Sequence, residues 1–321
     1  MTLARFSLVL SLLLTVATGA AGQPDYPSRP LRLLHGFAPG GNADAVSRII
    51  ADEMSRGLGQ PVIVEAKPGA GGNIASAAAA KSAPDGYTLI LLTGGHTVSA
   101  ALYNALQFDP VEDFTFVSTV TKFPFFIAVR PDTFASMKEL ITKAQAKSGG
   151  VNFGSAGVGT TQHLTGELLA LQSGTRFTHV PYRGGATATT ALLRGEIDVL
   201  VDTGAALAGQ AAAGTVRLIG VSSKDRWSRT PEIPTVAETV LPGFDIVSWT
   251  GLAVPAGAPA PVVAKLRAEL HRTLAVPEVQ ERLRALDSEP APSSGEDMRA
   301  LVKRQIEVWT RVVKEAGVEK R

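Results

Sequence analysis

The residues best placed to hold a ligand follow a short apolar run near the start of the chain. Leu31–Leu34 predicts a strand, and after His35–Phe37 the chain reaches the loop Ala38–Gly41, before a helix that begins near Asn42. A helix N-terminus presents free backbone N–H groups and partial positive charge, so it favours an anion. Glycine lets the backbone come close to a ligand. We therefore expect this loop to hold one end of a small carboxylate through backbone amides and water, without doing chemistry on it.

Further loops rich in Gly, Ser, Thr and Asn, and poor in Lys and Arg, follow other predicted strands. Most loops of this kind are only tight turns. Several of them brought together would present converging N–H groups that hold a carboxylate without a fixed cation. The residues that we expect to contact the ligand are Phe37, Ala38, Gly40, Gly41, Asp44, Thr93, Gly94, His96, Ser155, Ala156, Gly157, Gly159, Thr160, Thr161, Tyr182, Gly184, Asp202 and Thr203.

Large aromatic side chains are candidates for the walls of this site. Phe37, Tyr182 and Trp249 lie in or beside the predicted loops. Large aromatics are more often core residues, so a core position is an equal alternative for each. Apolar walls near Phe37 and Trp249 would suit an aromatic or a dicarboxylic acid.

Three polar side chains could recognise other parts of the ligand. Asp44, in the first turn of the predicted helix, and Asp202, at a strand end, could accept a hydrogen bond from a ligand donor such as an amine. Each is equally suited to a helix cap or to an interdomain hydrogen bond. His96 could reach a distal carboxylate, although an exposed structural histidine is the simpler interpretation.

The sequence lacks the common catalytic motifs. Its five histidines form neither HExxH nor another metal-ligand spacing, and no G-x-S-x-G elbow occurs. Lys67–Gly72 is neither a Walker loop nor a dinucleotide fingerprint. Ser155 and His163 could join an acid in a triad, but a loop hydroxyl and a helix residue are the favoured interpretation. We expect no catalytic residue, no metal site and no cofactor.

The first residues predict export to the periplasm. Arg5 precedes the apolar stretch Phe6–Val16, and small residues lead to a cleavage site near Gly22, so residues 1–22 resemble a secretory signal peptide. An uncleaved membrane anchor is the alternative. The absence of cysteine excludes thiol nucleophiles and Cys-ligated metals, and a net charge of +2 with 6% aromatic residues does not indicate nucleic acid. A soluble monomer is expected.

Strand and helix patterns alternate over the first hundred residues of the mature chain. Predicted strands at 31–34, 62–65 and 87–92 flank two helices, an order that forms a parallel sheet with right-handed crossovers. A glycine loop at 93–97 and a long link at 108–122 are expected next. Open α/β folds bind ligands at the carboxyl edge of the sheet, where these loops lie.

The same pattern restarts after residue 124, which predicts two α/β domains. The helical tail is too short for a third domain and is expected to fold back onto the first. Domain 1 is then 23–124 plus 250–321, and domain 2 is 125–249. The chain would cross between the domains twice, and two domains joined in this way form a cleft that closes about a hinge.

Short segments along the whole mature chain resemble the Bug-type receptors, the extracytoplasmic solute-binding proteins of tripartite tricarboxylate transporters. The resemblance implies the two-domain Venus-flytrap fold of type II periplasmic binding proteins, with two interdomain crossings. It also implies a small carboxylate ligand, with one carboxylate bound largely through water and backbone amides of Phe37–Gly41, Ser155–Thr161 and Pro181–Gly184. The segments are Phe37–Asp44 (FAPGGNAD), Gly59–Val64 (GQPVIV), Lys67–Ala75 (KPGAGGNIA), Ala83–Leu89 (APDGYTL), Asn152–Leu164 (NFGSAGVGTTQHL), Val180–Gly184 (VPYRG), Gly195–Asp198 (GEID), Pro234–Glu238 (PTVAE) and Trp249–Pro255 (WTGLAVP).

Three positions depart from the family's usual residues. Ala38 replaces a second proline, Gly95–His96 replaces an Asn–Gly-like pair, and Thr203 replaces a frequent Asn. In the family they face the variable end of the ligand, so the acid could be a di- or tricarboxylate, an amino acid or an aromatic acid. The resemblance implies membrane permease subunits as partners. A sensory module that signals to a membrane kinase and a secreted α/β hydrolase are the alternatives.

Overall fold

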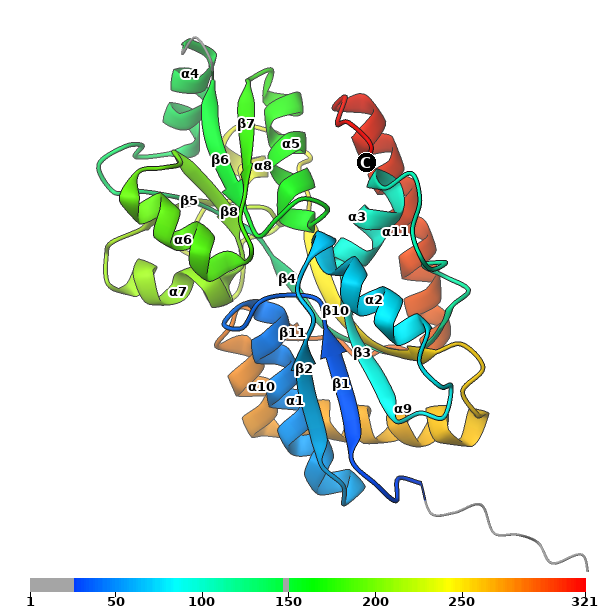
Figure 1. The fold of residues 1–321 in the computed structure, drawn as a ribbon. Coiled ribbons are helices and arrows are strands. Elements are labelled where there is room, and N and C mark those ends of the chain that lie inside the picture. The colour runs from blue at the N-terminus through cyan, green and yellow to red at the C-terminus, as the bar shows by residue number, and fades with distance from the viewer. Residues whose placement is uncertain (1–25, 147–149) are drawn as a thin grey trace, which may run out of the picture.

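Two β-sheets, each with helices on both faces, organise the chain into two domains (Figure 1). The computed structural model describes residues 26–146 and 150–321. The predicted signal peptide, residues 1–22, lies outside these ranges. No helix within them is both long and apolar enough to cross a bilayer.

The first sheet has six strands, of which three are parallel. Their order is β11 (Glu289–Pro290), β4 (Phe114–Pro124), β10 (Val247–Pro255), β3 (Thr88–Thr93), β1 (Leu31–His35) and β2 (Val62–Ala66). β1 pairs with β2 and β3 in parallel, which confirms the parallel arrangement predicted from the alternating strands and helices. β4, β10 and β11 extend this sheet in antiparallel pairs.

Helices cover both faces of the first sheet. They are α1 (Asn42–Leu58), α2 (Asn73–Ala80), α3 (Gly94–Leu102), α9 (Ala260–Ala275), α10 (Pro277–Arg284) and α11 (Gly295–Glu315), with a 3₁₀ turn, η1 (Ala70–Gly72), before α2. Side chains alternate along each strand, so Leu89 and Leu91 pack with α1, α9 and α10, while Ile90 and Leu92 pack with α2 and α11. Figure 1 shows these two groups of helices on opposite sides of the sheet.

The second sheet has five strands. Their order is β7 (Phe177–Pro181), β6 (Val151–Ser155), β8 (Val199–Asp202), β5 (Phe126–Val129) and β9 (Arg217–Val221). Its helices are α4 (Met137–Ala146), α5 (Thr161–Ser173), α6 (Gly185–Arg194), α7 (Gly204–Ala212) and α8 (Val236–Thr239). Ile127 packs with α4 and α5, whereas Ala128 packs with α6 and α7. Thr235 and Glu238 form a capping box at the start of α8.

The two crossings between the sheets run side by side. β4 pairs with β10 along its whole length, and Pro124 lies opposite Val247. After Pro124 the chain enters β5 of the second sheet, and it returns at β10. The predicted link at 108–122 is therefore wrong over most of its length. Nearly every residue of β4 is buried, so the strand lacks the alternation that reveals strands, and its partner lies far along the chain.

Ser222 ties the two crossings together. Its Oγ accepts a hydrogen bond from the N–H of Phe125 (2.8 Å) and donates one to the carbonyl of Ile246 (2.6 Å). Its own backbone N–H donates to Phe125, and its carbonyl accepts from Ile246, each at 2.8 Å. Ser222 is fully buried. One residue after β9 thus fixes both segments that join the domains.

The predicted glycine loop at 93–97 is wrong, because α3 begins directly after β3. The side chain of Thr93 caps this helix by accepting a hydrogen bond from the N–H of Gly95 at 3.2 Å. Gly94 and Gly95 have low intrinsic helix propensity, so the sequence conceals the helix start. A Cβ on Gly94 would lie 2.5 Å from Ser248 Oγ, so the packing requires glycine there.

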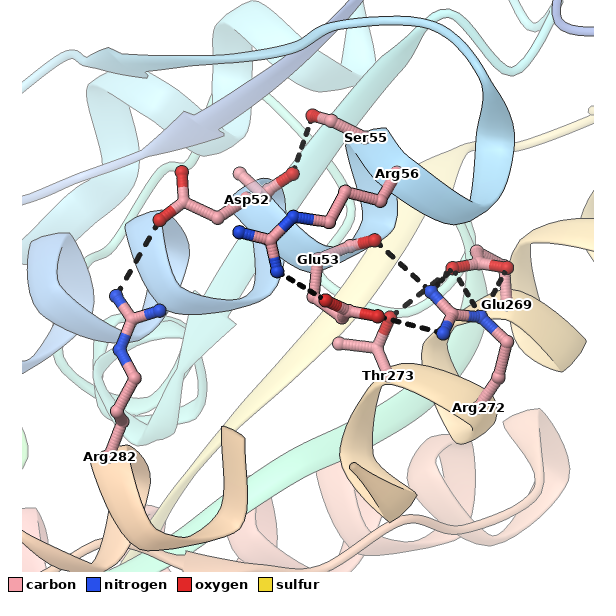
Figure 2. A network of polar contacts seen from close by, with 9 residues as sticks. Asp52, Glu53, Ser55, Arg56, Glu269, Arg272, Thr273 and Arg282 are labelled. Atoms are coloured by element: carbon pink, nitrogen blue, oxygen red, sulfur yellow. Dashed lines mark hydrogen bonds and ion pairs between the residues drawn. The ribbon is translucent and has the colours of Figure 1, made fainter. Parts of the chain in front are cut away.

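An ion-pair network joins the C-terminal half of α1 to α9 (Figure 2). The guanidinium of Arg272 lies 2.8 Å from Glu53 Oε1 and 2.7 Å from Glu269 Oε1. Arg56 pairs with Glu53 at 2.9 Å. Both glutamates are largely buried, so breaking the network would leave a buried charge unpaired. The network therefore holds in place the helix that carries the first loop at its N-terminus.

Candidate functional site

Two adjoining chambers lie between the domains, at the carboxyl ends of the parallel strands of both sheets. The inner chamber has a volume of about 40 Å³ and the outer chamber one of about 550 Å³. Phe37, Ala38 and Ala156 line both of them. A cavity needs roughly 10–15 Å³ of such volume to hold one water molecule, so the inner chamber has room for a group of carboxylate size. The outer chamber has room for the rest of a small organic acid.

Both domains line the inner chamber. Its residues are Phe37, Ala38, Gly41, Asn42, Ala43 and Thr93 from the first sheet's loops, Phe123, Phe125 and Ser248 from the crossings, and Ala156, Thr161, Gln162, Gly184, Gly185, Asp202 and Thr203 from the second sheet's loops. The outer chamber is lined by Gly36, Phe37, Ala38, Pro68, Gly69, Ala70, Gly71, Tyr103, Ala156, Gly157, Val158, Pro181, Tyr182 and Arg183.

The N-termini of five helices surround the inner chamber. α1 and α6 contribute the pairs Gly41–Asn42 and Gly184–Gly185, while α3, α5 and α7 contribute Thr93, Thr161 and Thr203. Each of these residues is the N-cap or the first residue of its helix. The backbone N–H groups and the positive dipole ends of these helices therefore place partial positive charge around one small space. This arrangement can hold an anion without a cationic side chain.

Asp202 is the titratable residue among the described side chains that line the inner chamber. Its Oδ1 accepts hydrogen bonds from the N–H of Thr203 (2.8 Å) and from Gln162 Nε2 (3.3 Å). Its Oδ2 is buried and has no hydrogen-bond partner among the described residues. Burial raises the pKa of Asp202 to about 6. Oδ2 can thus accept a hydrogen bond from a ligand N–H or O–H group when Asp202 is ionised, or donate to a ligand oxygen when it is protonated.

Glycines allow the loops of the two domains to touch. A Cβ on Gly71 would lie 2.7 Å from the carbonyl oxygen of Gly159, and Gly71 has a φ of +65°. A Cβ on Gly184 would lie 3.3 Å from the Cβ of Ala38 across the inner chamber. The glycine loops are therefore more than tight turns, because they permit backbone contact between the domains.

The outer chamber contains residues that were not predicted as ligand contacts. Arg183, within the predicted loop Pro181–Gly184, adds a charged side chain, and Tyr103 adds a second aromatic ring besides that of Tyr182. The inner chamber adds Phe123 and Phe125, whose places depend on the crossing strand that the sequence does not reveal. In the described ranges, no group of three or more His, Asp or Glu side chains could hold a metal ion.

Asp44, a predicted ligand contact, instead organises the first loop. Its Oδ2 accepts a hydrogen bond from the N–H of Gly40 (3.1 Å), and its Oδ1 accepts one from Arg48 Nε (3.0 Å). His35 Nε2 lies 3.3 Å from the same oxygen. The Arg48 guanidinium, the Gly40 amide and His35 offset the effect of burial and hold the pKa of Asp44 below its usual range. Asp44 and Gly40 are not among the residues that line either chamber.

Ser155 and Thr160 likewise support the loop between β6 and α5. Ser155 Oγ lies 2.7 Å from His179 Nε2 and accepts a hydrogen bond from the N–H of Gly157 (3.1 Å). Thr160 caps α5 by accepting a hydrogen bond from the N–H of His163 (3.2 Å). Burial lowers the pKa of His179 to about 3, so its ring is neutral at pH 7. Ser155 is fully buried, and its hydroxyl is engaged within the loop.

His96 and Trp249 lie in the core of the first domain. His96 Nε2 donates to the carbonyl of Pro110 at 2.8 Å, and burial lowers the pKa of His96 to about 4. Trp249 is 3% exposed and donates from Nε1 to Gln305 Oε1 at 2.7 Å. Of the two alternatives stated for Trp249, the structure therefore shows the core position and not the cleft wall. Alternation along β10 turns Trp249 toward α11 and leaves Ser248 to face the chamber.

A comparison of sequences places the chain in a family. Residues 46–318 match the model of the tripartite tricarboxylate transporter family receptor. The chain therefore belongs to this family of solute-binding receptors, and the resemblance stated from its short segments is confirmed. It is similar to the protein BugT of Bordetella pertussis, with 30% identity over 99% of each chain.

Solved structures of similar proteins share the fold. The structure of R. palustris Rpa4515 with adipate has a TM-score of 0.89 and 31% identity, and covers 92% of this chain and 100% of that one. The structure of MatC from Rhodopseudomonas palustris with bound malate has a TM-score of 0.83 and 32% identity, and covers 90% and 100%. These similarities confirm the two-domain periplasmic-binding-protein fold.

Proposed function

We propose that the protein is a periplasmic receptor that captures a small carboxylate between its two domains. The observation that carries this proposal is the convergence of five helix N-termini on a chamber whose described lining has no cationic side chain. One ligand carboxylate lies in the inner chamber and is held by backbone N–H groups and water. The predicted export signal at residues 1–22 accounts for the periplasmic location.

The rest of the ligand extends into the outer chamber. Arg183 there attracts a second carboxylate, and Tyr103 and Tyr182 provide flat apolar walls. The relatives whose structures contain adipate and malate point to a dicarboxylate. A ligand N–H or O–H group next to the first carboxylate would satisfy Asp202 Oδ2.

Ligand capture works by hinge closure, and the protein performs no catalysis. The domains turn about the two crossings at Phe125 and Ile246, which Ser222 joins by hydrogen bonds. The ligand stabilises the closed arrangement in proportion to its higher affinity for that arrangement. The closed receptor then delivers the acid to the membrane subunits of a tripartite tricarboxylate transporter.

A thermal-shift screen tests this function. Mature protein is unfolded and refolded to remove bound ligand, and is then heated with dicarboxylates, tricarboxylates, amino acids and aromatic acids. A ligand at about a hundred times its Kd should add roughly 2.7 kcal/mol of stability. A shift confined to one class of acid supports the receptor and identifies its ligand. No shift with any acid, together with turnover of ester substrates that Ser155→Ala abolishes, would instead support a hydrolase.

The membrane partner is tested separately. A pull-down with the ligand-loaded mature protein should recover permease subunits from a membrane extract. Recovery of a sensor kinase in their place would assign the receptor to signalling and contradict the transport role.

A further inference from the structure

The two domains also meet through polar side chains beside the chambers. Arg229, which follows β9, forms an ion pair with Glu281 of α10 at 2.9 Å. Ser228 Oγ donates a hydrogen bond to Glu289 Oε1 at 3.3 Å. α1 contacts α7 on the same side of the molecule. These contacts bring the turn after α10 against the N-terminus of α7.

Asp287 occupies the centre of this contact in an unusual backbone conformation. Its φ is +54°, in the left-handed region that L-residues other than Asn and Asp rarely adopt. The residue is 8% exposed, and its carboxylate lies directly against the Cα of Gly204. A side chain on Gly204 would overlap this carboxylate. The conformation of the turn therefore places the carboxylate of Asp287 in contact with the other domain.

That carboxylate lies at the N-terminus of α7. Gly204 is the first residue of α7, and the side chain of its N-cap, Thr203, makes no capping hydrogen bond. A negative charge at this end gains from the helix dipole, but the loss of water on burial outweighs this gain, because the pKa of Asp287 is raised. The carboxylate of Asp287 thus lies where α7's own N-cap leaves the helix end without a side-chain acceptor.

Ser288, the next residue, touches the opposite wall of the inner chamber. Its Oγ donates a hydrogen bond to Asn42 Oδ1 at 3.0 Å, and both residues are buried. Asn42 lines the inner chamber, and its Nδ2 is a buried donor with no hydrogen-bond partner among the described residues. The bond from Ser288 therefore orients the amide of Asn42. Thr203, on the other wall, directly precedes Gly204, the residue that the carboxylate of Asp287 contacts.

We propose that Asp287–Ser288, here named the closure turn, sets the balance between the open and closed domains and makes it depend on pH. Neither residue is among those that line the chambers, so the turn would act by positioning the domains rather than by touching the ligand. Its effect on ligand affinity rests on the proposed function. Its effect on domain closure does not.

The direction of the pH dependence follows from burial. Burial raises the pKa of Asp287 to about 6, Arg229 opposes this shift, and Glu232 adds to it. Arg229 is also paired with Glu281, and Glu289 with Arg284, so these charges face the turn from both domains. When the domains open, water reaches Asp287 and its pKa falls toward 3.8. Closure then takes up a proton, so acid favours the closed form.

The size of the effect follows from the same two pKa values. For a group with a pKa near 3.8 when open and near 6 when closed, the ratio of closed to open protein rises about tenfold from about pH 7.5 to about pH 5. Asp202 titrates in the same range, so the wild-type pH dependence alone does not identify Asp287. The difference in pH dependence between wild type and Asp287→Asn does identify Asp287.

The first test measures domain separation without ligand. The chain has no cysteine, so spin labels on Lys81→Cys and Glu196→Cys report one distance between the domains. In Asp287→Asn, the short-distance population should be larger than in wild type at about pH 7.5, and the difference should be smaller at about pH 5. Asn tolerates the left-handed backbone, so this variant keeps the turn. Asp132→Asn, the same change at an exposed carboxylate, is the control.

A second variant blocks the contact from the other domain. Gly204→Ala places a methyl group where the carboxylate of Asp287 lies, and should shift the distances toward longer values at both pH values. The proposal would be overturned if Asp287→Asn gave the same distance distribution as wild type at both pH values. It would also be overturned if Gly204→Ala left the distances unchanged.

Calorimetry with malate and adipate measures the effect of the closure turn on ligand affinity. Whichever acid binds the wild type should bind Asp287→Asn with a lower Kd at about pH 7.5, by up to about a hundredfold. Equal Kd values in the two proteins would count against the closure turn. If neither acid binds the wild type, the proposed ligand class fails, and the distance measurements still decide the role of the turn.

Discussion

Asp202 presents a buried carboxylate oxygen, with no hydrogen-bond partner among the described residues, to the inner chamber. A buried carboxylate of this kind destabilises the folded protein, because its charged form loses hydrogen bonds to water and the protein does not replace all of them. Burial raises the pKa of Asp202 from 3.8 to about 6, so the folded chain binds this proton more tightly than the unfolded chain does. The stability linked to Asp202 is therefore full below about pH 4 and is lost as the pH rises through about 6.

Asp202→Asn should remove this pH dependence. Between about pH 5 and about pH 7.5, the free energy of unfolding of the ligand-free variant should fall by about 1 kcal/mol less than that of the wild type. Urea unfolding at the two pH values measures the difference. Asp132→Asn, whose side chain is 82% exposed, should behave as the wild type. A variant that retains the full wild-type dependence would contradict the assignment of the shift to Asp202.

At the level of elements, the sequence predicts the loops better than the strands that join the domains. Glycine and hydroxyl residues after parallel strands point to the carboxyl edge of each sheet, and Phe37, Ala156 and Thr203 do line the chambers there. Phe123 and Phe125 belong to or follow a strand with no alternation, whose partner is distant in sequence. Their contribution arises only when β4 and β10 pair, so local pattern could not predict it.

Asp44 and Ser155 show the same limit on a smaller scale. Each borders a loop that lines the chambers, Asp44 in the first turn of α1 and Ser155 at the end of β6, and each has the chemistry of a ligand contact. Asp44 is instead engaged by Gly40 and Arg48, and Ser155 by His179. Spacing places a residue in a loop, but tertiary packing decides whether its side chain faces the ligand or holds the loop.

The contact between the glycine loops gives a prediction at this scale. Gly71→Ala would place a Cβ 2.7 Å from the carbonyl oxygen of Gly159 in the other domain, so the domains should no longer close fully. We expect ligand affinity to fall at least about tenfold, equivalent to roughly 1.4 kcal/mol, measured by calorimetry with the acid found in the thermal-shift screen.

Gly174→Ala is the matched control for this variant. Gly174 has a φ of +63°, close to the +65° of Gly71, and a Cβ there would meet nothing within 4 Å. Both variants bear similar backbone strain, of roughly 1–2 kcal/mol, but only Gly71→Ala obstructs closure. Equal affinity in the two variants would show that the interdomain contact at Gly71 does not govern binding.

Over the whole molecule, two different contacts between the domains flank the chambers. On one side α5 packs against α3 and α11, and the apolar cluster there includes Leu164, Leu168 and Trp309. On the other side the closure turn meets α7 through charged and polar groups. Burial of apolar surface changes little with pH, whereas the polar contact titrates. The apolar contact therefore stabilises the closed arrangement equally at all these pH values, and the closure turn adds a contribution that depends on pH.

Both contacts act through the hinge, where Ser222 joins the crossings. Ser222→Ala would remove the hydroxyl that accepts from the buried N–H of Phe125 and donates to the carbonyl of Ile246. An unsatisfied buried group costs about 1–3 kcal/mol, so the free energy of unfolding should fall by about 2 kcal/mol. The two crossings would also be free to move relative to each other, which should broaden the distribution of distances between the spin labels in the two domains.

Ser223→Ala separates the hinge effect from the loss of any buried hydroxyl nearby. Ser223 is 4% exposed, and its Oγ donates to the carbonyl of Asp225 within the same segment, at 2.8 Å. It should lower stability without widening the distance distribution, because that bond does not involve either crossing. If Ser222→Ala and Ser223→Ala give distributions of equal width, the domains turn about a point other than Ser222, and the paired strands β4 and β10 alone set the hinge.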